Sequence, residues 1–201
     1  MKLIELKKTT ALSVLLVFLI FLFFSLNRIF VPIAEAFVNN HELLKLNRQE
    51  YREYSALGGN FKFSLPDSWQ TRVEHFGGKE IIYNMFFNSQ DSKIHGFIQV
   101  WNLNKPLKQF LEESKKSSVG AVDFKYYKMK EIMPGKKRGY LIEYSRAVGD
   151  GRYIKAYEVF IEGDSNAMYR ASFFSDEDDW KSYYPVLFNR IVRSFVIEQT
   201  Q

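Results

Sequence analysis

The stretch FKFSLPDSWQ, Phe61–Gln70, decides how the folded part of this 201-residue chain begins. Apolar and polar side chains alternate over Phe61–Ser64, which is typical of a half-buried strand. Leu65-Pro66-Asp67 then predicts a turn, because proline fixes its own φ and has no N–H for a sheet ladder. Trp69 follows this turn, and we expect the fold to bury its large ring.

The sequence after this turn predicts a series of strands joined by tight turns. Gly149-Asp150-Gly151 and Gly163-Asp164-Ser165-Asn166 separate runs that are rich in aromatic and β-branched residues, which is a hairpin pattern. Consecutive hairpins indicate an antiparallel sheet. The expected strands are 79–89, 95–103, 123–133, 138–148, 152–162 and 167–175.

Two helices are expected to flank the sheet. Residues 106–118 begin with a proline and place their apolar side chains on one side, which predicts the first helix. The second lies near the C-terminus, where apolar residues recur every three or four positions and predict one buried stripe. The members of this stripe are Trp180, Tyr184, Leu187, Ile191 and Phe195.

The start of the second helix is set by polar residues. Ser175 is the expected N-cap, and the acids at 176–179 would favour the positive end of the helix dipole. Pro185 should kink this helix or delay its start, since proline disrupts a helix interior.

The N-terminal segment is expected to be a transmembrane helix. Ala11–Leu26 is apolar apart from two serines, and continuing to Ile33 gives enough length to cross the hydrocarbon core. Three lysines precede the run and only Arg28 follows it closely, so we expect a cytoplasmic N-terminus and residues 37–201 outside the cytoplasm. Ala34-Glu35-Ala36 has the pattern of a cleavage site, so an uncleaved anchor over 1–33 and a cleaved signal that secretes the remainder both stay open.

Residues 34–59 are expected to form a helical stalk or linker. The stretch 34–57 has no glycine or proline and is rich in helix formers, and Gly58-Gly59 supplies a stop. Alternatively, this segment continues the membrane helix beyond a kink at Pro32. The folded domain is then expected over 60–197.

The composition excludes several kinds of site. Cysteine is absent, which excludes disulfides, thiolate metal sites and cysteine nucleophiles. The net charge is +5, but the basic residues are scattered, and we interpret the KKR at 136–138 as a solvated turn. No nucleic-acid partner is expected, because nucleic-acid binders cluster their basic residues on one stripe.

No catalytic constellation is predicted either. Gly163-Asp164-Ser165 resembles the block of one esterase class, but no histidine follows His95 to activate the serine. The acidic run at 176–179 lacks the ligand spacing of a calcium loop, and His41 and His75 lack metal-ligand spacing, as does His95. We therefore expect no enzymatic activity, no catalytic residue, no cofactor and no metal ion.

The opening strand that ends in Leu-Pro-x-x-Trp and the closing run YYPVLFNRIVRSF resemble the PsbP-like family, whose superfold includes the Mog protein that binds the Ran GTPase. The resemblance covers residues 60–197 and implies an α+β fold, with an antiparallel sheet between helices in an α-β-α sandwich. In the closing run it rests on Phe188, Ile191, Ser194 and Phe195. The structural motif, with four members of the helix stripe included, comprises Phe61, Phe63, Leu65, Pro66, Trp69, Trp180, Leu187, Ile191 and Phe195.

The resemblance also bears on function. Photosynthetic members are extrinsic subunits that support a membrane complex, and the Mog branch binds a protein, although none of their binding motifs transfers to a residue here. We expect an extracytoplasmic domain, anchored in the cell membrane by residues 11–33, that binds or supports a protein partner. The alternative is a small-molecule or lipid carrier, or an unrecognised hydrolase, with an aromatic-lined cavity between sheet and helix. A sealed core without a cavity above roughly 300 Å³ would exclude the ligand version.

Overall fold

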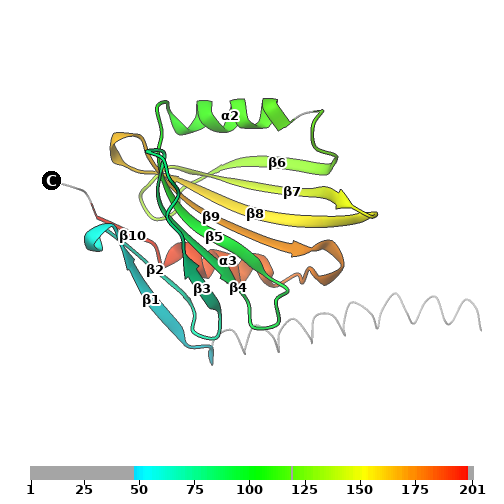
Figure 1. The fold of residues 1–201 in the computed structure, drawn as a ribbon, viewed down its shortest axis with the longest axis horizontal. Coiled ribbons are helices and arrows are strands. Elements are labelled where there is room, and N and C mark those ends of the chain that lie inside the picture. The colour runs from blue at the N-terminus through cyan, green and yellow to red at the C-terminus, as the bar shows by residue number, and fades with distance from the viewer. Residues whose placement is uncertain (1–47, 119, 199–201) are drawn as a thin grey trace, which may run out of the picture. The chain divides into compact units, whose positions relative to one another are not determined.

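The computed structural model describes residues 48–118 and 120–198, and the compact unit that they form begins at Gln49. Its main element is a strongly twisted antiparallel sheet of seven strands in the order β3-β4-β5-β9-β8-β7-β6 (Figure 1). The strands are β3 (Gln70–Val73), β4 (Ile81–Asn88), β5 (His95–Asn102), β6 (Phe124–Ile132), β7 (Gly139–Gly149), β8 (Arg152–Glu162) and β9 (Ala167–Asp176).

Glycine-rich turns set the register of the central hairpins. Gly149, Asp150 and Gly151 all have positive φ between β7 and β8, a conformation that glycine and aspartate tolerate better than other residues. Ser165 and Asn166 have positive φ in the next turn, between β8 and β9. The predicted hairpins and antiparallel pairing are confirmed.

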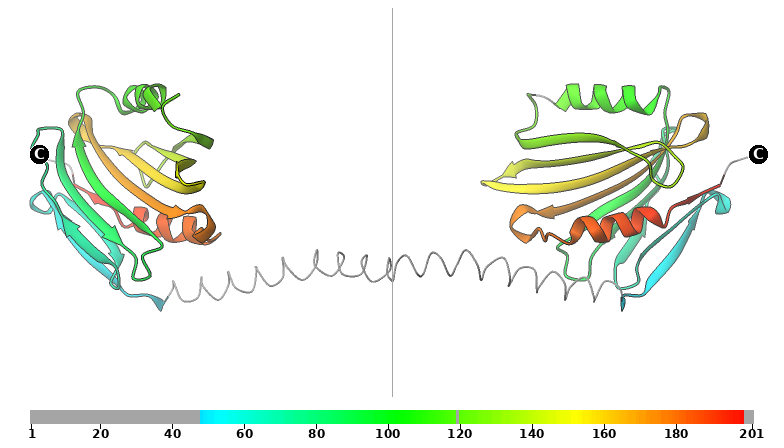
Figure 2. Two further views of the ribbon diagram at one scale, coloured as in Figure 1. Left: turned by 45° about the vertical axis from the view of Figure 1, so that its right-hand side comes forward. Right: turned by 180° about the vertical axis from the view of Figure 1, so that it is seen from behind.

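Two helices cover opposite faces of this sheet (Figures 1 and 2). Helix α2 (Leu107–Ser118) packs Leu107 and Leu111 against a cluster that contains Tyr140 and Phe160. Helix α3 (Tyr184–Arg193) places Phe188 on the other face, where its ring stacks on Phe173 at 4.2 Å. Because alternate side chains of a strand point to opposite faces, the two cores are separate layers. The expected antiparallel sheet flanked by helices is confirmed.

A small sheet lies on the α3 side of the large one. It consists of β1 (Tyr51–Ala56), β2 (Phe61–Pro66) and β10 (Val196–Ile197), with β2 in the middle. The Phe61 ring lies 4.9 Å from Tyr169 of β9, which joins the two sheets. The turn predicted at Leu65-Pro66-Asp67 is wrong for Leu65 and Pro66, which belong to strand β2 because β1 extends the pairing to Pro66.

The helical stalk expected over 34–59 is wrong for residues 51–56, which form strand β1. Six residues of β1 pair with β2, and the ring of Tyr54 stacks on Phe63 at 5.5 Å. Helix propensity is worth only a fraction of a kcal/mol per residue, so strand pairing and ring burial override it. The remainder of the stalk and the transmembrane segment lie outside the described residues.

Neither helix within residues 48–118 and 120–198 has both the length and the apolar character needed to cross a membrane.

The last helix begins later than its N-cap prediction requires. Ser175 is not its N-cap; it is fully buried near the end of β9, where its hydroxyl donates to the carbonyl of Asp176 at 3.3 Å. The acids 177–179 form a separate 3-10 turn, and α3 starts at Tyr184 with Pro185 in its first turn. Proline fits this position because its missing N–H would have no intrahelical partner there. The predicted delay at Pro185 is confirmed.

Candidate functional site

The opening motif forms part of the core between the large sheet and α3. Trp69 is only 6% exposed, its ring stacks on Phe87 at 5.1 Å, and its backbone N–H donates to the Pro66 carbonyl at 3.0 Å. Phe87 in turn contacts Phe173, which stacks on Phe188 of α3. The tryptophan therefore connects the turn after β2 to the closing helix.

The other motif residues lie in the same layer. Phe61, Phe63, Leu65 and Ile191 are fully buried, and Leu187 is nearly so. The two ends of the domain meet at Ser194, whose hydroxyl accepts the Ser64 N–H at 2.8 Å and donates to the Ile191 carbonyl at 2.6 Å. The remaining two members flank α3: Trp180 lies before it, 5.9 Å from the Phe188 ring, and Phe195 lies after it, 5.1 Å from the Phe61 ring.

Residues that could have formed an esterase site are far apart. Ser165 lies in the exposed turn before β9, whereas His95 begins β5 and pairs with Phe174 near the other end of β9. About seven residues of strand separate them, or roughly 20 Å. Burial lowers the pKa of His95, opposed by the negative charge of Asp176. These two side chains cannot act as nucleophile and base together.

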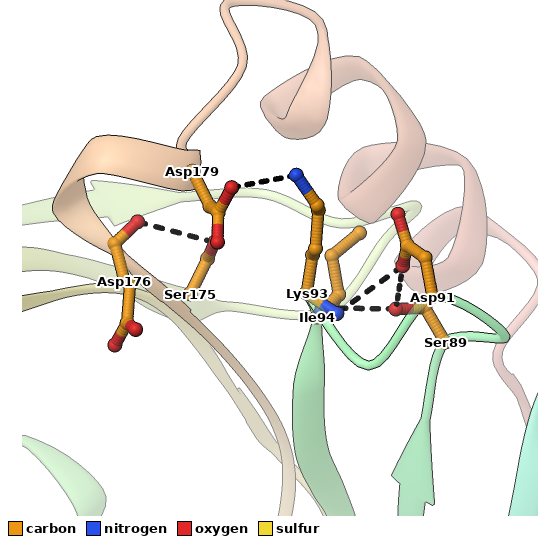
Figure 3. Close-up of polar contacts among 7 residues, drawn as sticks. All are labelled: Ser89, Asp91, Lys93, Ile94, Ser175, Asp176 and Asp179. Carbon is orange, nitrogen blue, oxygen red and sulfur yellow. Dashed lines mark hydrogen bonds and ion pairs between the residues drawn. The ribbon is translucent and has the colours of Figure 1, made fainter.

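The acidic run does not converge on a single point. Asp179 pairs with Lys93 at 2.7 Å, and Glu177 pairs with Lys125 and, at 3.8 Å, with Lys155. In the loop before β5, Asp91 accepts from the Ser89 hydroxyl at 2.7 Å, and in Figure 3 the Lys93 side chain lies between it and Asp179. Within the described ranges, no group of three or more histidines or carboxylates could hold a metal ion.

A cavity of about 360 Å³, which we call the α2 cavity, lies between α2 and the sheet. It exceeds the roughly 300 Å³ at which ligand pockets begin, so the ligand alternative is retained. Six aromatic residues from β5, α2, β6, β7 and β8 line it: Trp101, Phe110, Phe124, Tyr127, Tyr144 and Phe160.

An ion pair forms part of the lining of this cavity. Glu158 is 4% exposed and accepts from the Arg170 guanidinium at 2.8 Å and from the Tyr144 hydroxyl at 3.0 Å. Burial and the negative charge of Glu158 raise the pKa of Tyr144. The Tyr144 hydroxyl therefore stays protonated and can donate a hydrogen bond. The guanidinium of Arg170 lies between two rings, 4.7 Å from Phe97 and 5.0 Å from Phe160. This contact fixes the position of a partly buried cation.

Strand register explains why these polar residues meet. Arg170 lies directly opposite Gln99 on one side and Phe160 on the other, and Gln99 lies opposite Asn84. Gln99 donates to Asn84 at 2.8 Å and accepts from the Trp101 indole at 2.8 Å. Sequence reasoning missed this row, although a charged residue inside an apolar strand, as at Glu158, is the signal that could have found it.

A wider groove of about 780 Å³, the α3 groove, lies between α3 and the β6–β7 end of the sheet. Among the described residues, four cations line it, Lys130, Lys136, Lys137 and Arg193, and no carboxylate does. Lys137 lies 3.7 Å from Asp164, while the other three have no ion-pair partner in the part of the chain that the structure describes. The apolar lining includes Ile132, Leu141, Ile161, Val192, Phe195 and Ile197.

The KKR at 136–138 lies in the turn between β6 and β7, as predicted, and part of it also lines the groove. Lys136 and Lys137 line the groove, whereas Arg138 turns away and pairs with Glu131 at 2.7 Å. The alternation of Lys130 and Ile132 on one face of β6 is the pattern that could have indicated it.

No protein-family model matches the chain, and a comparison with curated proteins finds no match. Solved structures do match. The solution structure of cyanobacterial PsbP (CyanoP) from Synechocystis sp. PCC 6803 superposes with a TM-score of 0.52 at 15% identity, over 74% of this chain and 93% of that one.

A protein of unknown function from Pseudomonas aeruginosa superposes with a TM-score of 0.46 at 16% identity, over 75% of this chain and 99% of that one. The CyanoP match covers nearly the whole of that chain, with a TM-score above 0.5. The described residues therefore form a domain with the PsbP-like fold.

Proposed function

We propose that this protein is a membrane-anchored, extracytoplasmic, non-enzymatic accessory domain that binds a protein partner. The partner contributes a segment that is both acidic and apolar, and this segment occupies the α3 groove. The observation that carries the proposal is the composition of the groove, which within the described ranges has an apolar lining with four cations and no carboxylate.

The charges of the groove favour an acidic partner. Lys130, Lys136 and Arg193 are exposed and have no ion-pair partner among residues 48–118 and 120–198. Glu143, the next residue on the same face of β7 after Leu141, does not line the groove. Unpaired charges of one sign at the rim of an apolar surface steer an oppositely charged partner and select against a basic one.

The backbone beside the groove supports a segment in extended conformation. Strand β6 is an edge of the seven-stranded sheet, so it has no further strand beside it within the described ranges. An edge strand presents N–H and C=O groups that an added strand can pair with. A partner segment can thus place apolar side chains in the groove and acidic ones near the lysines.

The anchoring part of the proposal rests on sequence. Residues 11–33 are long and apolar enough for one membrane crossing, and the lysines before them favour a cytoplasmic N-terminus. The non-enzymatic part is supported by the separation of Ser165 from His95 and by the individual ion pairs of Glu177 and Asp179.

Quantitative co-purification from membranes of the source cells tests the proposal. The full chain is compared with a groove variant, Lys130→Gln with Lys136→Gln and Arg193→Gln. A control variant with the same charge change replaces exposed lysines elsewhere, Lys79→Gln with Lys116→Gln and Lys181→Gln. We expect a protein with an acidic, apolar segment to be retained by the parent and the control and lost from the groove variant. Equal recovery by all three chains, or no specific recovery, contradicts the proposal.

A further inference from the structure

We infer that the α2 cavity is a separate binding site for a small amphiphilic anion, with a planar or compact apolar body and one acidic group. This site is independent of the α3 groove, because the two lie on opposite faces of the sheet and share no lining residue.

The size and lining of the cavity define the ligand body. Its volume of about 360 Å³ lies at the small end of the range for ligand pockets, which suits one or two rings rather than a lipid with two chains. Aromatic side chains line it, including Trp101, Phe110 and Tyr127. Planar apolar groups stack favourably on such rings.

The charges define the acidic group. Of the residues that the structure describes, three cations line the cavity, Lys115, Arg146 and Arg170, together with one carboxylate, Glu158. Glu158 pairs with Arg170 at 2.8 Å and also accepts from the Tyr144 hydroxyl. Lys115 lies 5.1 Å from the Tyr127 ring, and neither Lys115 nor Arg146 has an ion-pair partner in the described part of the chain. An anion in the cavity would supply the missing negative charge.

A buried hydrogen-bond donor of Arg170, which lines the cavity, suggests that the ligand supplies an acceptor. The Nε atom of Arg170 is shielded from solvent and has no hydrogen-bond partner among residues 48–118 and 120–198. The side chain cannot easily turn toward water, because rings on two sides hold its guanidinium. Buried donors without an acceptor are rare in folded proteins, and an acidic ligand can provide one.

The C-terminal half of α2 forms the entrance. Leu107 and Leu111 anchor the first half of the helix in the core, whereas Ser114 and Lys115 are exposed and yet line the cavity. A ligand can therefore enter beside Lys115 without unfolding of the domain.

The three tryptophans allow a direct test. Trp101 lines the cavity, whereas Trp69 and Trp180 line neither the cavity nor the groove. The full chain, labelled with ¹⁵N-tryptophan in phosphatidylcholine nanodiscs, is titrated with 2-naphthoate and, as an uncharged match, with 2-naphthalenemethanol. We expect 2-naphthoate to shift the indole N–H resonance of Trp101 only, at lower concentration than the alcohol does. The variant Trp101→Phe assigns that resonance.

Variants separate this site from the groove. Lys115→Gln with Arg146→Gln should weaken 2-naphthoate binding about tenfold and leave the alcohol unchanged, the expectation for loss of charge-assisted contacts. The matched variant Lys116→Gln changes a neighbouring exposed lysine and should bind as the parent does. The inference is overturned if the Trp101 resonance stays unshifted, if both compounds bind equally, or if Lys130→Gln with Arg193→Gln in the groove abolishes binding while the cavity variants do not.

Discussion

Replacing Trp69 by alanine tests whether the opening motif holds the domain together. The indole is 6% exposed and lies between the turn after β2 and the Phe87–Phe173–Phe188 ring series. Trp69→Ala removes this burial and leaves a cavity that the surrounding rings cannot fill, which costs about 3–5 kcal/mol. A domain of this size loses about 2–4 °C in Tm per kcal/mol, so we expect a Tm lower by about 6–20 °C.

The assay is thermal unfolding of residues 49–201, followed by circular dichroism, with an exposed aromatic as the control. Phe76 is 44% exposed on the loop between β3 and β4, and Phe76→Ala should cost about 1 kcal/mol or less. If Trp69→Ala melts at the same temperature as Phe76→Ala, the structural role of the motif is refuted.

The remaining predictions concern the domain boundary, pH and topology. A chain of residues 60–201 lacks β1 and the Tyr54–Phe63 stack, so it should melt well below residues 49–201; equal melting would show that β1 is dispensable. Burial lowers the pKa of His95 in the folded protein, so protons bind the unfolded chain more strongly and stability falls as pH decreases through about 6.5 and below. Urea unfolding should therefore show a smaller loss of stability between about pH 7.5 and 5 in His95→Gln than in the parent, and identical losses would contradict this. The sequence contains no cysteine, so an introduced cysteine is the only thiol that a maleimide can label. In intact spheroplasts, a membrane-impermeant maleimide should label Ser165→Cys and leave Thr9→Cys unlabelled. The reverse pattern would contradict the proposed topology.

The sequence predicted the parts of the fold that local signals specify. The hairpin at Gly149–Gly151 and the first turn of α3 at Pro185 follow from backbone restrictions of glycine and proline, which act whatever the surroundings. The core position of Trp69 follows from one large apolar ring beside a proline turn. Each of these features depends on a few adjacent residues.

Features that depend on distant pairing were not predicted. Residues 51–56 have helix-forming side chains but become a strand because β2 lies beside them. The buried position of Ser175 and the two-residue strand β10 depend likewise on partners far along the chain. The short strand β3 shows no clear alternation of buried and exposed residues. Its position in the sheet depends on pairing with β4.

The two candidate sites were missed for a related reason. The α2 cavity combines Glu158 with Arg170 and Tyr144, which register places together across three strands. The α3 groove combines Lys130 and Lys136 near one edge of the sheet with Arg193 of the last helix. Sequence proximity shows neither combination, although an aromatic-lined cavity between sheet and helix was the stated alternative.

Site-specific photo-crosslinking from the groove tests the central claim most directly. Benzoyl-phenylalanine is incorporated at Met133, which is 63% exposed and lines the groove, and separately at Val186, which is 53% exposed on α3 and does not. In membranes of the source cells, we predict a protein adduct from Met133 alone, attached to an acidic, apolar segment of the partner and lost when Lys130→Glu and Arg193→Glu reverse the charge. Adducts only with lipid, equal adducts from both positions, or an adduct that survives charge reversal would contradict the account.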